Sequence, residues 1–432
     1  MRAYFSRLRD FSRNARLLLI SNVFSLKPPM GGLAWGLWMV LFNLYLLEQG
    51  YDIAFIGTLL AINAVAHAVA IFPLGLFCDV VGRRRAFLVG GLLDLFMRLA
   101  MVSTESVPLL FAASAGAGVT LALVHVAWEP FMAESSTWQD RTHLFSINRS
   151  LGLISILGGS LLAGGLPLAL AGSFDLGSSM VRPFRLTLFL AIALNLVSLL
   201  PIYFTRETRR PISASISLSK IQSRATIGKF MIVSGLTGLA FGFIQPFFNL
   251  FFSGKLGASA DQIGVILALG SLVGAVASLA APVLTERWGR VATLSLTTLL
   301  AIPFTLGMAF SPGYSLVILS FLLMMGFRTI GYPVAATFRM EAVLEQERAS
   351  TVGLTHLSFD ILFAPSQYLA GQMMNNGQFW LPYTLTAFLA VVIAVAYWVF
   401  FRRLEPEVAA RLRTLEAGER AADSVREVLT KG

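Results

Sequence analysis

The chain carries the same pattern twice, 207 positions apart. An acid, a glycine and an arginine recur in the same order in the two copies: Asp79, Gly82 and Arg83, then Glu286, Gly289 and Arg290. The segments 131–141 and 338–348 repeat at the same offset. Two related halves in an apolar chain predict a pseudo-symmetric membrane protein with a substrate site at the interface between the repeats.

The composition supports a membrane protein. Hydrophobic residues make up 56% of the chain and charged residues 13%, against roughly 25% charged residues in soluble domains. Runs of about 20 apolar residues are long enough to cross a hydrocarbon layer as helices. We expect twelve spans, near residues 29–48, 54–77, 86–104, 107–131, 144–171, 183–204, 229–252, 260–283, 292–310, 314–336, 350–374 and 378–401.

The spans group into an all-α membrane fold with two pseudo-symmetric six-helix bundles. We expect the first bundle at 1–204, a cytoplasmic linker at 205–228, the second bundle at 229–402 and a cytoplasmic tail helix at 403–432. The first 28 residues show no small-residue cleavage site after a short apolar core, which argues against a signal peptide. We predict that they form an amphipathic surface helix leading into the first span.

The formal net charge of +10 is distributed unevenly. Most of the 33 Lys and Arg fall in the N-terminal segment, the loops after even-numbered spans, the linker and the tail. The positive-inside rule then predicts that both termini are cytoplasmic. Anionic lipid in the cytoplasmic leaflet accounts for the basic balance, so we expect no nucleic-acid partner. The predicted location is the inner membrane of a bacterium.

The sequence Gly-x-Leu-x-Asp-x-x-Gly-Arg-Arg-Arg at 75–85 lies between the second and third spans. It resembles the loop signature of the major facilitator superfamily, and a degenerate copy lies between the eighth and ninth spans. With the repeat and the twelve spans, the resemblance covers residues 15 to 402. It implies two bundles that rock around a central cavity lined by the first, fourth, seventh and tenth spans. The Gly-Pro signature of the drug-antiporter branch is absent from the fifth span.

The repeated loops predict a conformational latch. The carboxylates of Asp79 and Glu286 can accept hydrogen bonds from a helix N-terminus, whose dipole favours negative charge, and Arg83 and Arg290 can reach them. The alternative is that these loops only turn the chain. In the second pair of loops, Glu134 with Arg141 and Glu341 with Arg348 could tie adjacent spans, or could be solvated surface charges.

Charged groups at membrane depth are costly and indicate function. The proton-coupling candidates are Asp360, His356, Glu129 and Arg328. His356 precedes Asp360 by one helical turn and could relay a proton. Arg328 could neutralise Asp360, either as a structural bridge or within the coupling site, or could hold an anionic group of a substrate. Glu129 could instead be an interfacial residue.

Two further predictions concern the remaining polar residues of the spans. Asp94 and Arg98 are four residues apart, which predicts a structural ion pair. His67 is interpreted as a packing residue. The residues expected to line the substrate cavity are aromatic or carry amide or imidazole groups: Trp38, Asn43, His125, Phe243, Gln245, Phe247 and Asn249. Pro246 predicts a discontinuous seventh span, although some of its aromatic rings could face lipid.

These features predict a secondary transporter that works by alternating access. We expect proton-coupled export of lipophilic or aromatic small molecules by a monomer. A lipid or glycolipid flippase, a proton-coupled metabolite symporter and a non-transporting sensor are the alternatives. The four histidines lack metal-ligand spacing, and no phosphate-binding loop or nucleophile elbow is present. We therefore expect no enzyme activity, cofactor, metal or catalytic residue.

Overall fold

The structure is a computed structural model that describes residues 11–26, 31–136, 141–174, 179–206, 222–344, 347–408 and 410. The side chains of residues 79, 129, 141–143 and 349 lie outside this description. The expected tail helix at 403–432 falls largely outside it, as does most of the expected linker.

All regular structure in the described residues is helical. The first half contains α2 (Arg13–Phe24), α3 (Leu33–Glu48), α4 (Ile53–Val81), α5 (Arg83–Ser103), α6 (Val107–Glu134), α7 (Arg141–Phe174) and α8 (Val181–Tyr203). The second half contains α9 (Arg224–Ile244), the 3-10 turn η3 (Gln245–Phe247), α10 (Phe248–Leu256), α11 (Ala260–Ser278), α12 (Ala281–Trp288), α13 (Arg290–Leu300), α14 (Ile302–Phe310), α15 (Tyr314–Glu341), α16 (Arg348–Asn375) and α17 (Trp380–Phe401).

These helices make twelve spans, six in each half, as the sequence predicts. Ten helical stretches in the described residues are long and apolar enough to cross a membrane, and α3 is apolar but shorter. The remaining span, α16, is a long helix that contains many polar residues. It packs between α9 and α4, so part of its surface faces protein rather than lipid, which makes polar side chains tolerable at membrane depth.

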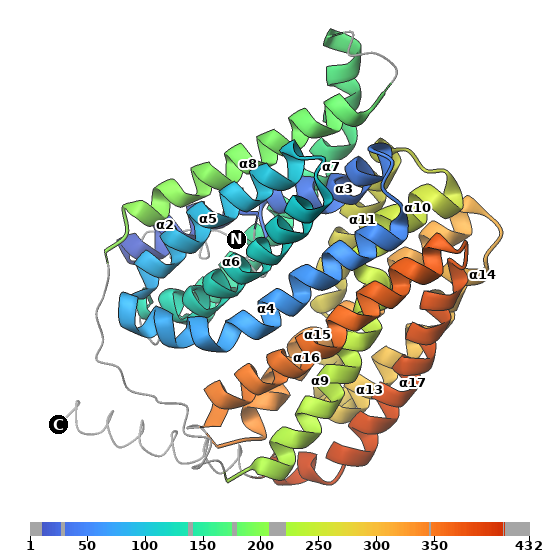
Figure 1. Cartoon of the computed structure of the whole chain (residues 1–432). Helices are drawn as coiled ribbons and strands as arrows, with labels where there is room; N and C mark the ends of the chain where they lie inside the picture. Colours follow the sequence, from blue (N-terminus) through green and yellow to red (C-terminus); the bar gives the residue numbers. More distant parts are fainter. Residues whose placement is uncertain are drawn as a thin grey trace.

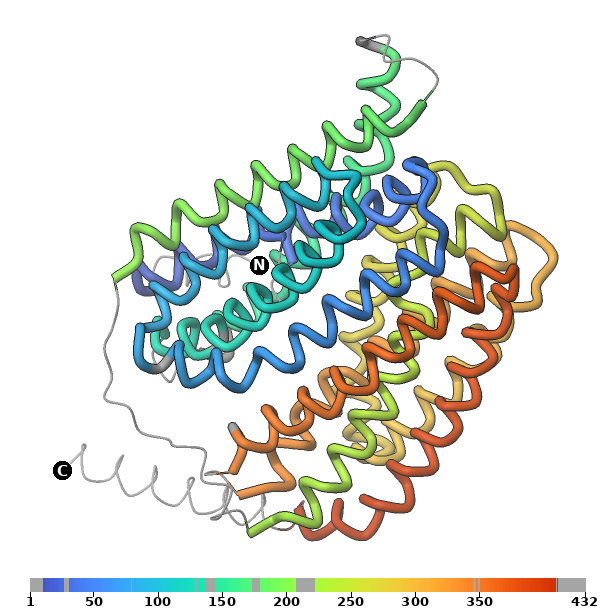
Figure 2. Tube along the Cα trace, viewed as in Figure 1, coloured from blue at the N-terminus to red at the C-terminus, as the bar shows by residue number. Residues whose placement is uncertain are grey.

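The two halves form two bundles, drawn in blue to green and in yellow to red in Figure 1. They meet where α4 packs on α16, α7 on α11, and α3 on α10 and α11. The tube in Figure 2 shows α4 and α16 running side by side along this junction. We call the end that carries Arg83, Arg290 and Arg402 the basic end, and the opposite end the far end.

Glycines allow the bundles to approach closely, and they do so symmetrically. A Cβ atom on Gly57 of α4 would lie 2.7 Å from the Cα atom of Gly371 on α16. A Cβ atom on Gly264 of α11 would lie 3.0 Å from the Cα atom of Gly164 on α7. Gly264 and Gly371 stand 207 positions after Gly57 and Gly164. The sequence repeat is therefore a pseudo-twofold relation in space, with helix backbones in contact on both sides.

The first span is broken, and the predicted surface helix is wrong. α2 packs against α7 and α8, and its Leu18, Ser21 and Asn22 side chains are fully buried. The chain leaves the helix at Ser25, whose carbonyl accepts hydrogen bonds from Gly32 and Trp35 at the start of α3. Because α2 has polar residues that find partners inside the bundle, it forms the first part of the span instead of lying on the membrane surface.

The seventh span is broken at the predicted place. α9 ends at Ile244, η3 contains Pro246, and α10 begins at Phe248. Proline has no backbone N–H and its ring clashes with the preceding turn, so a helix is interrupted there. The first and seventh spans are both broken, but at different positions of the repeat, and buried side chains flank each break.

Candidate functional site

A chain of three ionisable side chains crosses the junction between the bundles. The Nδ1 atom of His67 on α4 lies 3.1 Å from Oδ2 of Asp360 on α16. The Nε2 atom of His67 lies 2.9 Å from Nδ1 of His125 on α6. The contact with Asp360 is close enough for a charge interaction but lacks the alignment of a hydrogen bond, because Oδ2 has no hydrogen-bond donor. The three groups thus link two helices of one bundle to one helix of the other.

The pseudo-symmetry shows that helix packing does not require His67, His125 and Asp360. The residues at the equivalent positions in the other half are Gly274 for His67, Leu153 for Asp360 and Tyr332 for His125. The glycine contacts exist in both copies, but the histidines and the carboxylate exist in one. A group that packing can do without, and that is costly to place at membrane depth, is best explained by function.

His67 is the functional candidate that sequence reasoning missed. A single histidine in an apolar span gives no sign of which residues of other spans it faces, so the packing interpretation was the simpler one. The available signal was its replacement by glycine in the second copy of the repeat. Its side chain is 9% exposed and that of Asp360 is 14% exposed.

The other predicted coupling residues differ in how they lie relative to His67, His125 and Asp360. His356, one turn before Asp360, lies within electrostatic range of Asp360, His67 and Arg339. The side chain of Glu129 lies outside the described residues. Arg328 is not the partner of Asp360, contrary to one of the two sequence interpretations: its guanidinium lies over the ring of Phe241, with the Cζ atom 4.0 Å from the ring centre.

Asn43 and Asn249 join the bundles in this conformation instead of facing a substrate. The Nδ2 atom of Asn43 donates to the Pro246 carbonyl at 2.8 Å and to Oδ1 of Asn249 at 3.2 Å. The Nδ2 atom of Asn249 donates to the carbonyls of Met39 and Val40 at 3.1 and 2.9 Å. Each amide therefore bonds to the opposite bundle, and we call this arrangement the asparagine clasp.

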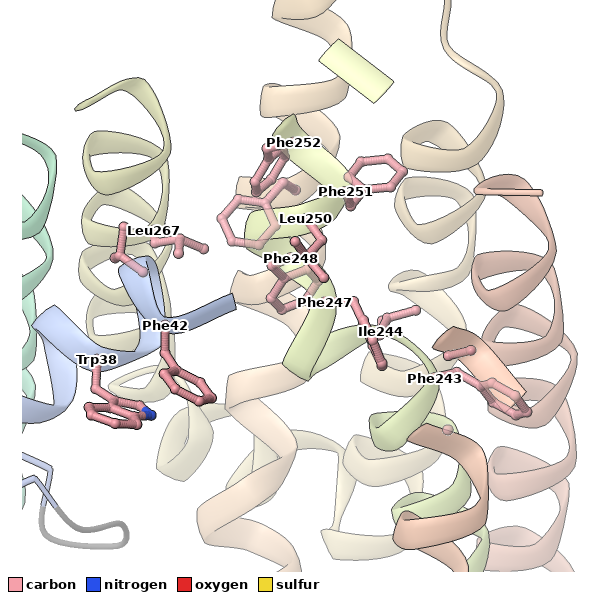
Figure 3. Close-up of a cluster of buried hydrophobic side chains, with 14 of the residues drawn as sticks. Trp38, Phe42, Phe243, Ile244, Phe247, Phe248, Leu250, Phe251, Phe252 and Leu267 are labelled. Carbon is pink, nitrogen blue, oxygen red and sulfur yellow. The ribbon is translucent and has the colours of Figure 1, made fainter. Parts of the chain in front are cut away.

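Most of the aromatic candidates are buried in the bundles. Phe243 and Phe247 belong to the hydrophobic core of the second bundle, and Figure 3 shows Phe243 on the side of the α9 segment away from Trp38. Trp38 is stacked on Phe42, with ring centres 4.4 Å apart. These three side chains are buried in this conformation. Gln245, in contrast, is exposed.

Asp94 and Arg98 are in contact in the middle of the first bundle. The Nε atom of Arg98 lies 3.2 Å from Oδ2 of Asp94, and the Asp94 side chain is fully buried. Thr120 donates to Oδ1 of Asp94 at 3.2 Å, and the Arg98 guanidinium lies 4.5 Å from the Trp38 ring centre. Asn195 also contacts Asp94, at 3.4 Å, and accepts from the backbone N–H of Leu26 beside the break in the first span. The pair thus supports both sides of that break.

At the basic end, the two loop motifs within each half contact each other through an ion pair. Arg83 lies 3.1 Å from Glu134, and Arg290 lies 2.6 Å from Glu341. The second pair stands 207 positions after the first. The predicted pairing of Glu341 with Arg348 is not the one observed, because Arg348 donates to the carbonyl of Met340 at 3.0 Å. The pairing of Glu134 with Arg141 involves a side chain outside the described residues.

Of the two acids of the predicted latch, the structure describes the side chain of Glu286. Glu286 is exposed and forms no hydrogen bond or ion pair with another described residue; Asp79 has no described side chain. The glycines of the motif have a clear local role. Gly82 and Gly289 have φ angles of 96° and 85°, a region that favours glycine, and each joins one helix to the next by a sharp turn.

Carboxylates also cap helices of the second bundle at the basic end. Glu405 accepts hydrogen bonds from the backbone N–H groups of Arg290 and Val291 at the start of α13. Glu347 accepts from the N–H groups of Gln222 and Ser223 at the start of α9. Burial of Glu347 opposes its ionisation, but these hydrogen bonds outweigh burial and lower the pKa of its carboxyl. An acid at a helix N-terminus is stabilising because it complements the helix dipole.

Reversing the charges of Arg290 and Glu341 together should restore the transport rate that either single charge reversal lowers. We expect Glu341→Arg to slow transport several-fold, because it places two guanidinium groups together at the end of α13 and α15, and Glu341→Arg with Arg290→Glu to recover most of the rate. Initial transport rates in proteoliposomes measure the effect. Equal rates for the single and double variants would contradict a role for this pair.

Two hollows of the described surface are lined by other residues. A groove of about 540 Å³ between α9 and α16 is lined by apolar side chains and Ser358. A second hollow of about 500 Å³ at the far end is lined by Glu48, Tyr51 and Glu105 among others. No group of three metal-ligating side chains occurs within the described residues.

The comparisons with known proteins agree with this architecture. A family model described as Major Facilitator Superfamily matches residues 30–227 and 230–432. A comparison with curated protein sequences gave no match. A solved structure of a variant of the nucleoside transporter NupG is 14% identical, with a TM-score of 0.72 over 90% of this chain and 100% of that chain.

Two further solved structures are similar at the same level of identity. A bacterial homologue of the human lysosomal transporter Spinster, in an inward-facing and occupied conformation, is 14% identical, with a TM-score of 0.73 over 90% of this chain and 96% of that chain. The D-xylose-proton symporter is 14% identical, with a TM-score of 0.72 over 90% of this chain and 97% of that chain. At this identity the structures show the fold alone, whereas the family model covers almost the whole sequence. The chain therefore belongs to the major facilitator superfamily and is a membrane transporter, not an enzyme.

Proposed function

We propose that this transporter is a proton-coupled exporter of lipophilic or aromatic small molecules that works by alternating access. The observation that carries the proposal is the His67–Asp360 contact, which places titratable groups of both bundles against each other at membrane depth. A coupling group must change the balance between two conformations when its proton changes. A contact that spans the moving interface meets this requirement directly.

The proposed mechanism uses the protonation states of the His67 chain. When His67 holds a proton on both ring nitrogens, it is a cation facing the Asp360 carboxylate, and the attraction holds α4 against α16. Transfer of the Nδ1 proton to Asp360 makes both groups neutral and weakens the link. The bundles can then separate at this junction. The Nε2 atom of His67 keeps its proton, 2.9 Å from Nδ1 of His125. Release of the Asp360 proton to water and uptake of a proton from water at Nδ1 of His67 then restore the ion pair, and the cycle can repeat.

The conformation of the structure supports an alternating-access assignment. The glycine contacts and the asparagine clasp join the bundles towards the far end, whereas both ion pairs of the basic end join helices of the same bundle. By the positive-inside rule the basic end faces the cytoplasm. We therefore propose an inward-facing state of a monomer in a bacterial inner membrane, with both termini in the cytoplasm. The bundle limits at 1–204 and 229–402 and the latch formed by Asp79 and Glu286 belong to the same proposal.

Replacing Asp360 should separate transport from the proton gradient. In liposomes with an imposed pH gradient, we expect Asp360→Asn to reduce gradient-driven accumulation of an aromatic dye at least tenfold, with the anion fluorescein and the cation ethidium tested in parallel. Exchange of dye at equal pH should persist, because the fold does not need the charge. His67→Gln should give the same result, and Glu105→Gln, an exposed carboxylate at the far end, serves as the control. Unchanged dependence of both variants on the gradient would exclude the His67 chain from coupling.

The same reconstitution distinguishes the remaining functions. Proton-coupled metabolite symport is the second candidate, because similar folds include a D-xylose-proton symporter and a nucleoside transporter. Movement of substrate and proton in the same direction would favour it. Movement of labelled phospholipid would favour a flippase, and no transport of any of these would favour a sensor.

A further inference from the structure

Arg328 is a positive charge at membrane depth that has no negative partner among the described side chains. Arg328 lies at the middle of α15 and is half-buried. Within the described residues its guanidinium lies over the face of Phe241 at 4.0 Å and within electrostatic range of Tyr383. No described group forms a hydrogen bond with its five N–H donors, and a guanidinium remains charged in proteins.

The carboxylates at membrane depth whose side chains the structure describes are used elsewhere. Asp360 faces His67, and Asp94 binds Arg98 and Thr120. Packing does not explain the arginine either, since the equivalent position in the first half is Leu121. An arginine in a span is costly unless it is paired or faces a polar space. The N–H donors of the Arg328 guanidinium are therefore available to a ligand.

The side chains beside Arg328 indicate what kind of ligand fits. Tyr332 lies four residues later on the same face of α15 and is well exposed. Gln245 lies four residues after Phe241 along the seventh span and is exposed. The guanidinium is thus accompanied by an aromatic ring, a phenol and an amide. α15 packs mainly on α11, α13 and α14, so the arginine reaches across to α9 rather than filling a helix contact.

We propose that Arg328 binds an anionic group of the transported molecule, and that Phe241, Gln245 and Tyr332 contact its aromatic or apolar part. Guanidinium groups bind carboxylate and phosphate oxygens through two parallel hydrogen bonds, and these are stronger than bonds between neutral groups. The substrate class is then an amphipathic organic anion. The proposal rests on the proposed transport function and narrows it from lipophilic molecules in general to acidic ones.

Matched pairs of probes test this assignment without knowledge of the natural substrate. The pairs are 2-naphthoate with 2-naphthamide and phenyl phosphate with phenol, which differ in charge and share an aromatic body. Stabilisation of the purified, full-length protein against thermal unfolding reports binding. We expect the anionic member of at least one pair to stabilise the wild type more strongly. Arg328→Gln should weaken its binding about tenfold to a hundredfold, the loss typical of a charge-assisted hydrogen bond.

Two variants keep the result interpretable. Arg328→Lys retains the positive charge but lacks the planar guanidinium group that donates two parallel hydrogen bonds. We therefore expect it to bind the anion with intermediate affinity. Arg185→Gln removes a different, solvent-reaching arginine and should leave the preference intact. Each shift is measured against the midpoint of the same variant without probe, so a change in intrinsic stability does not imitate a change in binding. If Arg328→Gln fails to fold, the comparison of Arg328→Lys with the wild type decides.

An anionic group on an apolar body could belong to a small organic acid or to an acidic lipid. Dioctanoyl phosphatidylglycerol, compared with dioctanoylglycerol, tests the lipid source separately. No preference for any anionic probe in the wild type, or a preference that survives in Arg328→Gln, would overturn the proposal. Neither result depends on Asp360→Asn, so failure of the anion site and failure of proton coupling are distinguishable.

Discussion

Leucine in place of Gly164 is expected to abolish transport, whereas leucine in place of the neighbouring Gly165 should leave it close to the wild-type rate. A Cβ atom on Gly164 would lie 2.8 Å from the Cα atom of Asp261 at the start of α11, and no atom lies within 4 Å of the same position on Gly165. Backbone atoms cannot move aside as a flexible side chain can. The substitution therefore prevents α7 and α11 from meeting and removes the conformation closed at the far end.

The pseudo-symmetric contact provides an independent check. Gly371→Leu should have the same effect as Gly164→Leu, because a Cβ atom on Gly371 would lie 2.8 Å from the Cα atom of Gly57. Substrate exchange in proteoliposomes measures transport, and size-exclusion chromatography establishes that each variant is folded. Wild-type exchange by a folded Gly164→Leu protein would show that the transport cycle does not need this close contact.

The largest effect on stability is expected from Asp94→Leu. This change leaves the Arg98 guanidinium, whose side chain is 7% exposed, without its carboxylate in the middle of a bundle. Removing one partner of a buried ion pair typically costs about 3–5 kcal/mol, because the remaining charge stays buried without compensation. We expect a large fall in the midpoint of thermal unfolding in detergent, with little folded protein recovered from membranes.

A double variant separates the cost of the unpaired charge from the loss of contacts. Asp94→Leu combined with Arg98→Met removes both charges and keeps apolar volume, so it should recover a measurable part of the lost stability. Asn195 and Thr120 would still lack an acceptor, which sets a limit to the recovery. If the double variant is no more stable than Asp94→Leu alone, the unpaired arginine is not the cause of the destabilisation.

The asymmetry between the halves separates contacts that both copies of the repeat contain from charged groups that only one copy contains. The glycine contacts, the asparagine clasp and the ion pairs of the basic end occur in both copies. His67, Asp360, Arg328 and the Asp94–Arg98 pair occur in one copy each, and their counterparts are apolar or uncharged. A duplicated fold needs its contacts twice, whereas the proposed coupling site and the proposed anion site are each needed once in a transport cycle.

The sequence determined the membrane class, the twelve spans, the repeat and the break at Pro246, because these follow from local composition and from a comparison of the chain with itself. It also indicated that Asp94 and Arg98 would pair, since residues four apart share a helix face. The tertiary structure decided the partners that are distant in sequence: His67 for Asp360, Glu341 for Arg290, and Asn249 for Asn43. It also placed α2 inside the first bundle. The physical reason is that periodicity gives the direction of a side chain around its own helix, whereas the residue it meets depends on how the bundles pack.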